Sequence, residues 1–159
     1  MGCAMKLPQT VLRYAAVTVV TVFFLAGPLH AARDDVPTPK EYGVYVKTGA
    51  KLVRVLPNIV LQEGKMLYIE SNNPPHFSLK DVKYFILYGK QDMQYLTFNN
   101  LFFINQSPLG KSRFIFGKDV EVEVKKRSDA LYTVQPKGLF GRGYYALWMN
   151  DSAWDFIVE

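Results

Sequence analysis

Residues 119–125 read Asp-Val-Glu-Val-Glu-Val-Lys, an unbroken alternation of charged and apolar side chains. Successive side chains of a β-strand point to opposite sides of the sheet. The alternation therefore predicts a strand with Val120, Val122 and Val124 facing the core and the charged residues facing water. A sheet with one dry and one wet face is typical of antiparallel β proteins, and no helix-length amphipathic pattern competes with it.

Two hairpins are predicted around this strand. Residues 113–116 (Arg-Phe-Ile-Phe) precede it and are joined to it through Gly117-Lys118, where a glycine suits the first position of a type II′ turn. Residues 95–98 and 101–104 are separated by Asn99-Asn100, and asparagine tolerates the left-handed conformation of a type I′ turn.

Further short apolar runs are separated by Gly, Pro, Asn, Asp or Lys, which is the spacing of an all-β domain. The expected strands cover residues 43–47, 51–56, 66–70, 83–88, 130–134, 143–149 and 154–158. Residues 83–88 are apolar on both faces and predict a central strand, although Ser78 and Asp81 have the spacing of a helix capping box. We expect a single small antiparallel sandwich or a partly open barrel, a choice that depends on strand pairing.

The N-terminus predicts export. Lys6 and Arg13 precede an apolar run over residues 14–27, and small residues follow it, as in a secretory signal peptide. The run is shorter than the roughly 20 residues that span a bilayer, so a retained membrane anchor is the weaker alternative. The expected organisation is a signal peptide (1–32), a flexible leader (33–42) and one β domain (43–159), in a periplasmic or secreted protein that is not integral to the membrane after cleavage.

Composition excludes several classes of function. Cys3 is the only cysteine and leaves with the signal peptide, which excludes a disulfide framework, a thiolate nucleophile and cysteine-ligated metals in the mature chain. The mature chain holds 17 basic and 14 acidic residues, a net charge of +3, which is not typical of a nucleic-acid-binding protein. No cofactor is expected and no metal site is assigned.

Candidate catalytic groups are few. His76 is the only histidine left after processing, and its Asn- and Pro-rich surroundings predict a loop. It is either a general base or a solvated loop residue, and no catalytic motif accompanies it. Glu121 and Glu123 would lie about 7 Å apart on one strand face, a separation found in glycosidases, but alternation explains them as an exposed face. No catalytic residue is assigned.

Candidate binding residues come from two segments. In residues 143–149 both alternating faces are apolar, so either the strand is central or the face with Tyr144 and Trp148 binds a ligand. Lys125, Lys126 and Arg127 are either a solvated turn or a contact for anionic head groups or an acidic partner.

These observations predict an exported, non-enzymatic binding or accessory module of a cell envelope. Its partner would be an envelope protein, a glycan or a lipid head group. The alternative is a small secreted hydrolase that uses His76 or a carboxylate pair. A concave site that holds His76 and an acid favours the hydrolase, whereas a flat aromatic or basic face favours the module.

Processing gives the first testable prediction. We expect the protein from its native host to begin at Ala32 or Arg33, because the apolar run is short and small residues follow it. The intact mass of that material measures the N-terminus. A membrane-bound product that keeps residues 1–31 would contradict the prediction.

Overall fold

The computed structural model describes residues 36–49, 51–138 and 140–159, so the predicted signal peptide lies outside the described residues. Within these ranges the chain forms β-strands and one short 3-10 helix, η1 (Met93–Tyr95), and no α-helix. The prediction of an all-β, mainly antiparallel fold is confirmed.

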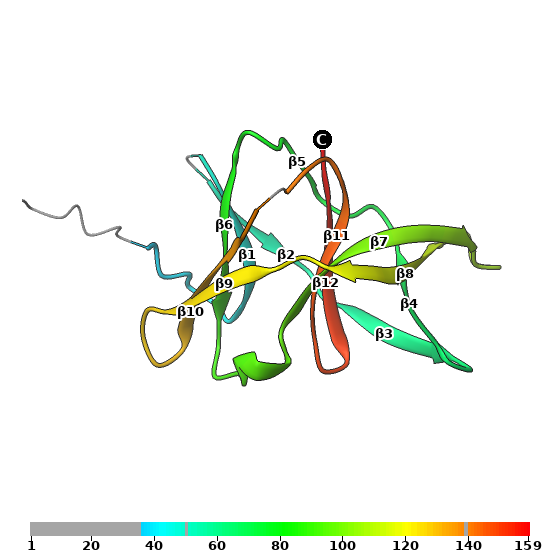
Figure 1. Ribbon diagram of the computed structural model, residues 1–159, viewed down its shortest axis with the longest axis horizontal. Helices are drawn as coiled ribbons and strands as arrows, with labels where there is room; N and C mark the ends of the chain where they lie inside the picture. Colours follow the sequence, from blue (N-terminus) through cyan, green and yellow to red (C-terminus); the bar gives the residue numbers. More distant parts are fainter. Residues whose placement is uncertain (1–35, 50, 139) are drawn as a thin grey trace, which may run out of the picture. The chain divides into compact units, whose positions relative to one another are not determined.

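One sheet has five antiparallel strands in the order β2-β1-β6-β10-β9 (Figure 1). Their bounds are β1 (Gly43–Thr48), β2 (Leu52–Val55), β6 (Val82–Tyr88), β9 (Val122–Lys126) and β10 (Leu131–Pro136). The apolar run over residues 83–88 lies in β6, between β1 and β10, which confirms the predicted central strand.

The other strands close into a six-stranded barrel, in the order β11-β7-β8-β4-β3-β12, because β12 also pairs with β11. Their bounds are β3 (Asn58–Glu63), β4 (Met66–Ser71), β7 (Thr97–Gln106), β8 (Ser112–Asp119), β11 (Gly143–Met149) and β12 (Ser152–Val158). The short strand β5 (His76–Phe77) adds a parallel pairing to the outer edge of β12. The barrel is thus closed rather than partly open, and the five-stranded sheet accompanies it.

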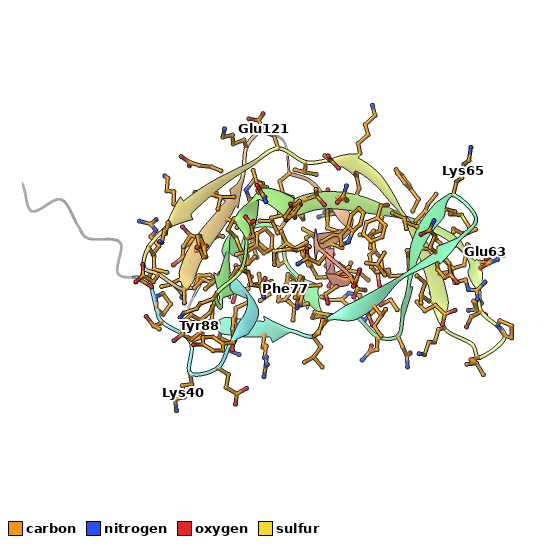
Figure 2. The ribbon with its side chains drawn as sticks, turned by 90° about the horizontal axis from the view of Figure 1, so that it is seen from below. Lys40, Glu63, Lys65, Phe77, Tyr88 and Glu121 are labelled. Carbon is orange, nitrogen blue, oxygen red and sulfur yellow. The ribbon has the colours of Figure 1, made fainter. Side chains whose placement is uncertain are left out.

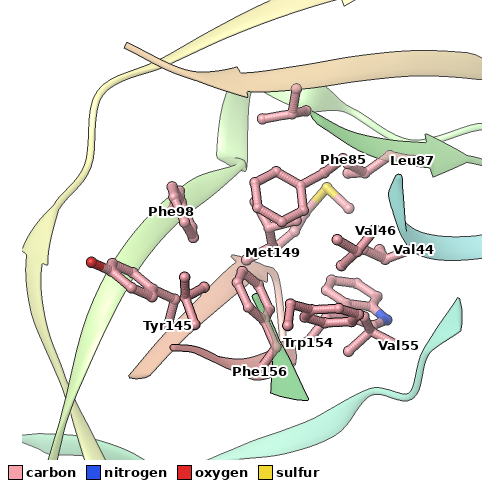
Figure 3. Packing of buried hydrophobic residues seen from close by; sticks show 14 residues of the cluster. Val44, Val46, Val55, Phe85, Leu87, Phe98, Tyr145, Met149, Trp154 and Phe156 are labelled. Carbon is pink, nitrogen blue, oxygen red and sulfur yellow. The ribbon is translucent and has the colours of Figure 1, made fainter. Parts of the chain in front are cut away.

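The main core lies between the five-stranded sheet and the outer side of the barrel wall formed by β7, β11 and β12. Phe85 from the sheet meets Phe98 and Phe156 from the barrel, with ring centroids 5.4 and 5.2 Å apart, and Figure 3 shows these rings converging. Such tilted aromatic pairs stabilise a core beyond their buried area. The two layers are held together by this cluster.

The barrel has its own interior. Ile69, Leu101 and Phe114 are buried inside it together with the small residues Ala146 and Ala153. Small and large side chains alternate, as expected where a narrow barrel must be filled.

The outer face of the five-stranded sheet is covered in part by residues from the predicted leader. Val36 packs against Tyr45, Ile86 and Leu131, and the Tyr45 hydroxyl donates a hydrogen bond to the Glu41 carbonyl at 2.8 Å. The domain boundaries given by the sequence stay predictions.

Both predicted hairpin turns are wrong. Gly117-Lys118 lies inside β8, where the pairing register with β7 shifts by one residue, and Asn99-Asn100 lies inside β7 opposite that shift. The β7–β8 hairpin instead turns between Ser107 and Lys111, where the Gly110 amide donates to the Ser107 carbonyl. A glycine within a strand marks a bulge or a close approach, which resembles a turn when only local sequence is considered.

The alternating stretch over residues 119–125 is only partly as predicted. The chain leaves β8 after Asp119 and enters β9 at Val122, so it crosses from the barrel to the five-stranded sheet within the predicted strand. Val120 and Val122 pack against the main core, but Val124 is 38% exposed because β9 is an edge strand. Val124 pairs with the fully buried Val134 and so lies on the core side of the sheet as predicted, but its edge position leaves it partly open to solvent.

The closing hairpin is confirmed. Residues 143–149 and 154–158 pair as β11 and β12, in register from Gly143–Val158 to Met149–Ser152. Asn150 at the turn adopts the left-handed conformation with φ 53°.

Substitution of Gly117 tests its placement inside β8. A Cβ there would lie 2.3 Å from the Phe102 ring and 3.0 Å from the Asn100 carbonyl oxygen. We expect Gly117→Ala to lower the free energy of unfolding by about 1–3 kcal/mol, the usual cost of overpacking. Denaturant melts measure it. The matched control Gly49→Ala has open space and should stay within about 0.5 kcal/mol. Equal effects of the two variants would contradict the strand assignment.

Candidate functional site

A polar cleft of about 650 Å³ opens where two neighbours of β12 separate. The edge of β12 that does not pair with β11 is shared by these two neighbours. β3 pairs with its start, at Ser152 and Ala153, and β5 pairs with its end, at Ile157 and Val158. The residues that line the cleft are Arg54, Leu56, Pro57, Asn58, Ser71, Asn72, Asn73, Pro74, Pro75, His76 and Asp155. Its volume suits a small ligand.

The inner end of the cleft is Asp155, a carboxylate that is only 2% exposed. Asn58 Nδ2 donates to its Oδ1 at 2.5 Å, and Ser71 Oγ donates to its Oδ2 at 2.5 Å. The Tyr144 hydroxyl lies 3.1 Å from both Asp155 Oδ2 and Ser71 Oγ. A buried charge is tolerated when hydrogen bonds replace its water, and three side chains from three strands meet this requirement.

Burial also changes the acidity of the tyrosine. Loss of solvent raises the pKa of Tyr144, and the negative charge of Asp155 raises it further, because both disfavour a phenolate at this position. Tyr144 is therefore a neutral donor in this network at physiological pH.

The alternation of β12 explains why the carboxylate points inward. Trp154 and Phe156 face the main core, so Asp155 between them faces the barrel interior. We did not single out Asp155 from the sequence. The available signal was an acidic residue in the middle of a strand of bulky apolar residues.

His76 lies at the rim of the cleft. It belongs to the two-residue strand β5, which corrects the predicted loop, and its side chain is 51% exposed, as a solvated histidine would be. Its Nδ1 lies 3.3 Å from Glu159 Oε2. Arg54, which also lines the cleft, pairs with Glu41 at 2.5 Å. The cleft thus holds a histidine and an acid in one concave site, the arrangement that favours the hydrolase.

Only one of the predicted binding residues belongs to this site. Tyr144 is a member of the Asp155 network, whereas Trp148 lies further along the same inner face of β11 and packs against Phe116, with ring centroids 4.7 Å apart. The Trp148 indole nitrogen donates to the Asn150 carbonyl at 2.6 Å. Both faces of β11 are covered, one by the barrel interior and one by the main core.

The basic residues are separate from the cleft lining. Lys125 pairs with Glu123 at 3.0 Å, Lys126 pairs with Asp129 at 3.3 Å, and Arg127 Nε donates to Thr133 Oγ1 at 3.1 Å.

The glutamate pair is also separate from the cleft. Glu121 contacts Lys137 at 3.0 Å, so each glutamate of the pair has its own lysine partner. The Glu121 side chain is 74% exposed and the Glu123 side chain is 45% exposed. The structure brings neither one to His76.

Comparison with protein-family models, curated proteins and solved structures finds no match for this chain. Within the described residues, no group of three or more His, Cys, Asp or Glu side chains is arranged to hold a metal ion. The same part of the chain contains no helix with the length and hydropathy needed to cross a membrane.

The raised pKa of Tyr144 predicts a change of stability at alkaline pH. A tyrosine in the unfolded chain titrates near pH 10, whereas the pKa of Tyr144 in the folded protein is higher. The stabilisation of the fold by neutral Tyr144 is therefore complete below about pH 10 and is lost as the pH rises toward the folded pKa. We expect the free energy of unfolding to fall above about pH 10, and to fall less steeply for Tyr144→Phe. Denaturant melts at several pH values measure this. Parallel pH profiles of the two proteins would contradict it.

Proposed function

We propose that this protein is an exported, non-enzymatic binding module of a cell envelope, and that its ligand occupies the cleft beside Asp155. The cleft lining offers the side-chain amides of Asn72 and Asn73, together with the rings of Pro57, Pro74 and Pro75. These groups hydrogen-bond to hydroxyl and acetamido groups, so the ligand class that fits is an envelope glycan.

The hydrogen bonding of Ser71 carries this proposal. A serine nucleophile needs a base that takes its proton, and in the Ser-His-Asp hydrolases an imidazole does so. Here the Ser71 hydroxyl donates to Asp155, and His76 instead contacts the exposed Glu159. The carboxylate is also occupied by Asn58 and Tyr144. The network suits a fixed polar surface that holds a ligand better than a set of groups that move protons.

A hydrolase is the second candidate, because His76 and Asp155 do line the same concave cleft. In that case substrate binding would have to bring His76 toward the reacting group, since catalytic hydrogen bonds often tighten only in the complex. The two candidates make different predictions for His76.

Titration with a β-1,4-linked N-acetylglucosamine oligosaccharide tests the proposal. We expect the wild-type protein to bind it, and Asn72→Ala to weaken binding about tenfold, the effect of losing one or two hydrogen bonds. The exposed amide of Gln135, on β10, lies outside the cleft lining, so Gln135→Ala should bind normally. His76→Ala should fold and still bind the oligosaccharide, because the half-exposed His76 side chain lies at the rim of the cleft. Calorimetry measures all four proteins.

Three results would contradict the binding module. The first is no binding by the wild type, and the second is an equal loss of affinity for the Asn72 and Gln135 variants. The third is cleavage of the oligosaccharide that disappears in folded His76→Ala, which would support the hydrolase instead.

A further inference from the structure

A smaller pocket, of about 260 Å³, opens at the end of the barrel where β11 turns into β12. Its described lining residues differ from those of the cleft, and they are Tyr95, Thr97, Trp148 and Asn150. Trp148 near the end of β11 pairs with Thr97 at the start of β7. η1 and the β11–β12 turn lie at the lower edge of Figure 1, the side from which Figure 2 is seen. We call this site the aromatic pocket, and the mouth of a β-barrel is a common position for a ligand.

The Trp148 indole is held in one orientation by the chain itself. It packs against Phe116, with ring centroids 4.7 Å apart, and Phe116 packs in turn against the barrel interior. The indole nitrogen donates to the Asn150 carbonyl at 2.6 Å, so the single polar group of this side chain needs no partner from a ligand. The indole therefore gives the pocket an apolar aromatic surface in a fixed position.

Tyr95 supplies the second ring. It is the last residue of η1, whose start is capped by Asp92, since the Asp92 carboxylate accepts a hydrogen bond from the Gln94 amide at 3.1 Å. Met93 and Leu96 pack against the main core and anchor this short helix. The Tyr95 ring is nevertheless 59% exposed. An exposed ring on an anchored segment is available to a ligand and loses little freedom when the ligand binds.

The other lining groups are polar and uncharged. Thr97 Oγ1 donates to Asn99 Oδ1 at 2.9 Å, so its proton is already used within the chain. The Asn150 side chain is exposed, and its amide makes no hydrogen bond to the described residues. A free amide offers both donors and an acceptor, which matches a hydroxyl group that also does both. The pocket therefore suits a neutral ligand with one apolar face and hydroxyl groups around its edge.

We propose that the aromatic pocket binds a single hexopyranose unit, with the C–H face of the sugar against Trp148 and Tyr95 and a sugar hydroxyl on the Asn150 amide. The pocket is smaller than the about 300–1,000 Å³ of sites for drug-sized ligands, so it suits one ring. Aromatic rings also bind quaternary ammonium ions, but none of the described lining residues has a carboxylate to balance that charge. This inference is independent of the ligand proposed for the cleft, because other residues carry it.

Nuclear magnetic resonance titration of the isotope-labelled protein with methyl β-D-glucopyranoside tests the site. The chain has two tryptophans, and Trp154 is buried in the main core. The indole N–H signal of Trp148 therefore reports on the aromatic pocket, and that of Trp154 is an internal control. The signal lost in Trp148→Phe identifies Trp148. We expect the Trp148 signal to shift until it saturates, while the Trp154 signal stays in place.

Two substitutions remove the proposed contacts one at a time. Tyr95→Ala removes the exposed ring, and Asn150→Gly removes the amide while glycine keeps the left-handed conformation, φ 53°. Each should raise the dissociation constant about fivefold, the effect of losing one aromatic contact or one hydrogen bond. Phe103→Ala is the matched control, since Phe103 is also 59% exposed but lies outside the lining, and it should bind normally.

Two further variants separate the possible causes. Tyr95→Phe keeps the ring and should bind as the wild type does. Asn72→Ala, which changes the cleft, should also bind the glucoside normally at the aromatic pocket, so the two proposed sites fail or succeed separately. Near-ultraviolet circular dichroism of each variant checks that the fold is intact.

The proposal is overturned by a wild-type Trp148 signal that does not move at any glucoside concentration. Unchanged affinity in both Tyr95→Ala and Asn150→Gly would also overturn it, as would an equal loss of affinity in Phe103→Ala. A Trp148 shift caused by choline and not by the glucoside would overturn it as well, because the pocket would then hold a cation.

Discussion

The pairing of β12 on both of its edges is the constraint on which the rest of the structure depends. One edge pairs with β11 along the whole strand and the other is shared by β3 and β5, so β12 closes the barrel. Its outward side chains, Trp154 and Phe156, attach the five-stranded sheet, and its inward Asp155 organises the polar network. A defect in this strand would affect the barrel, the main core and the cleft together.

The cleft is a consequence of the same topology. β3 and β5 each pair with only two residues of the seven-residue strand β12, at its opposite ends, and the gap between them occurs beside Asp155. The lining residues lie on β2, β3, β4, β5 and β12, on the connection from β2 to β3 and on the short loop from β4 to β5. A site built on paired strands is preorganised, which suits recognition of a small polar ligand.

Buried polar groups give this barrel directional contacts between its strands, which a wholly apolar interior would lack. Asp155 requires Asn58, Ser71 and Tyr144 at the same time, and removal of any donor leaves a buried charge less well satisfied. The network therefore links β3, β4, β11 and β12 by directional contacts. Apolar packing of Ile69, Leu101 and Phe114 supplies the non-directional part.

The sequence by itself determined the β class, the central strand over residues 83–88 and the closing hairpin, because alternation and the Asn150 turn act between near neighbours in the chain. Local signals failed at Gly117 and at Asn99-Asn100. These residues lie inside β8 and β7, where they meet the paired strand rather than form a turn. Only the tertiary structure decided the closed barrel and the cleft. Asn58 and Ser71 lie 97 and 84 positions from Asp155, so strand pairing alone brings their hydrogen-bonding groups within reach of the carboxylate.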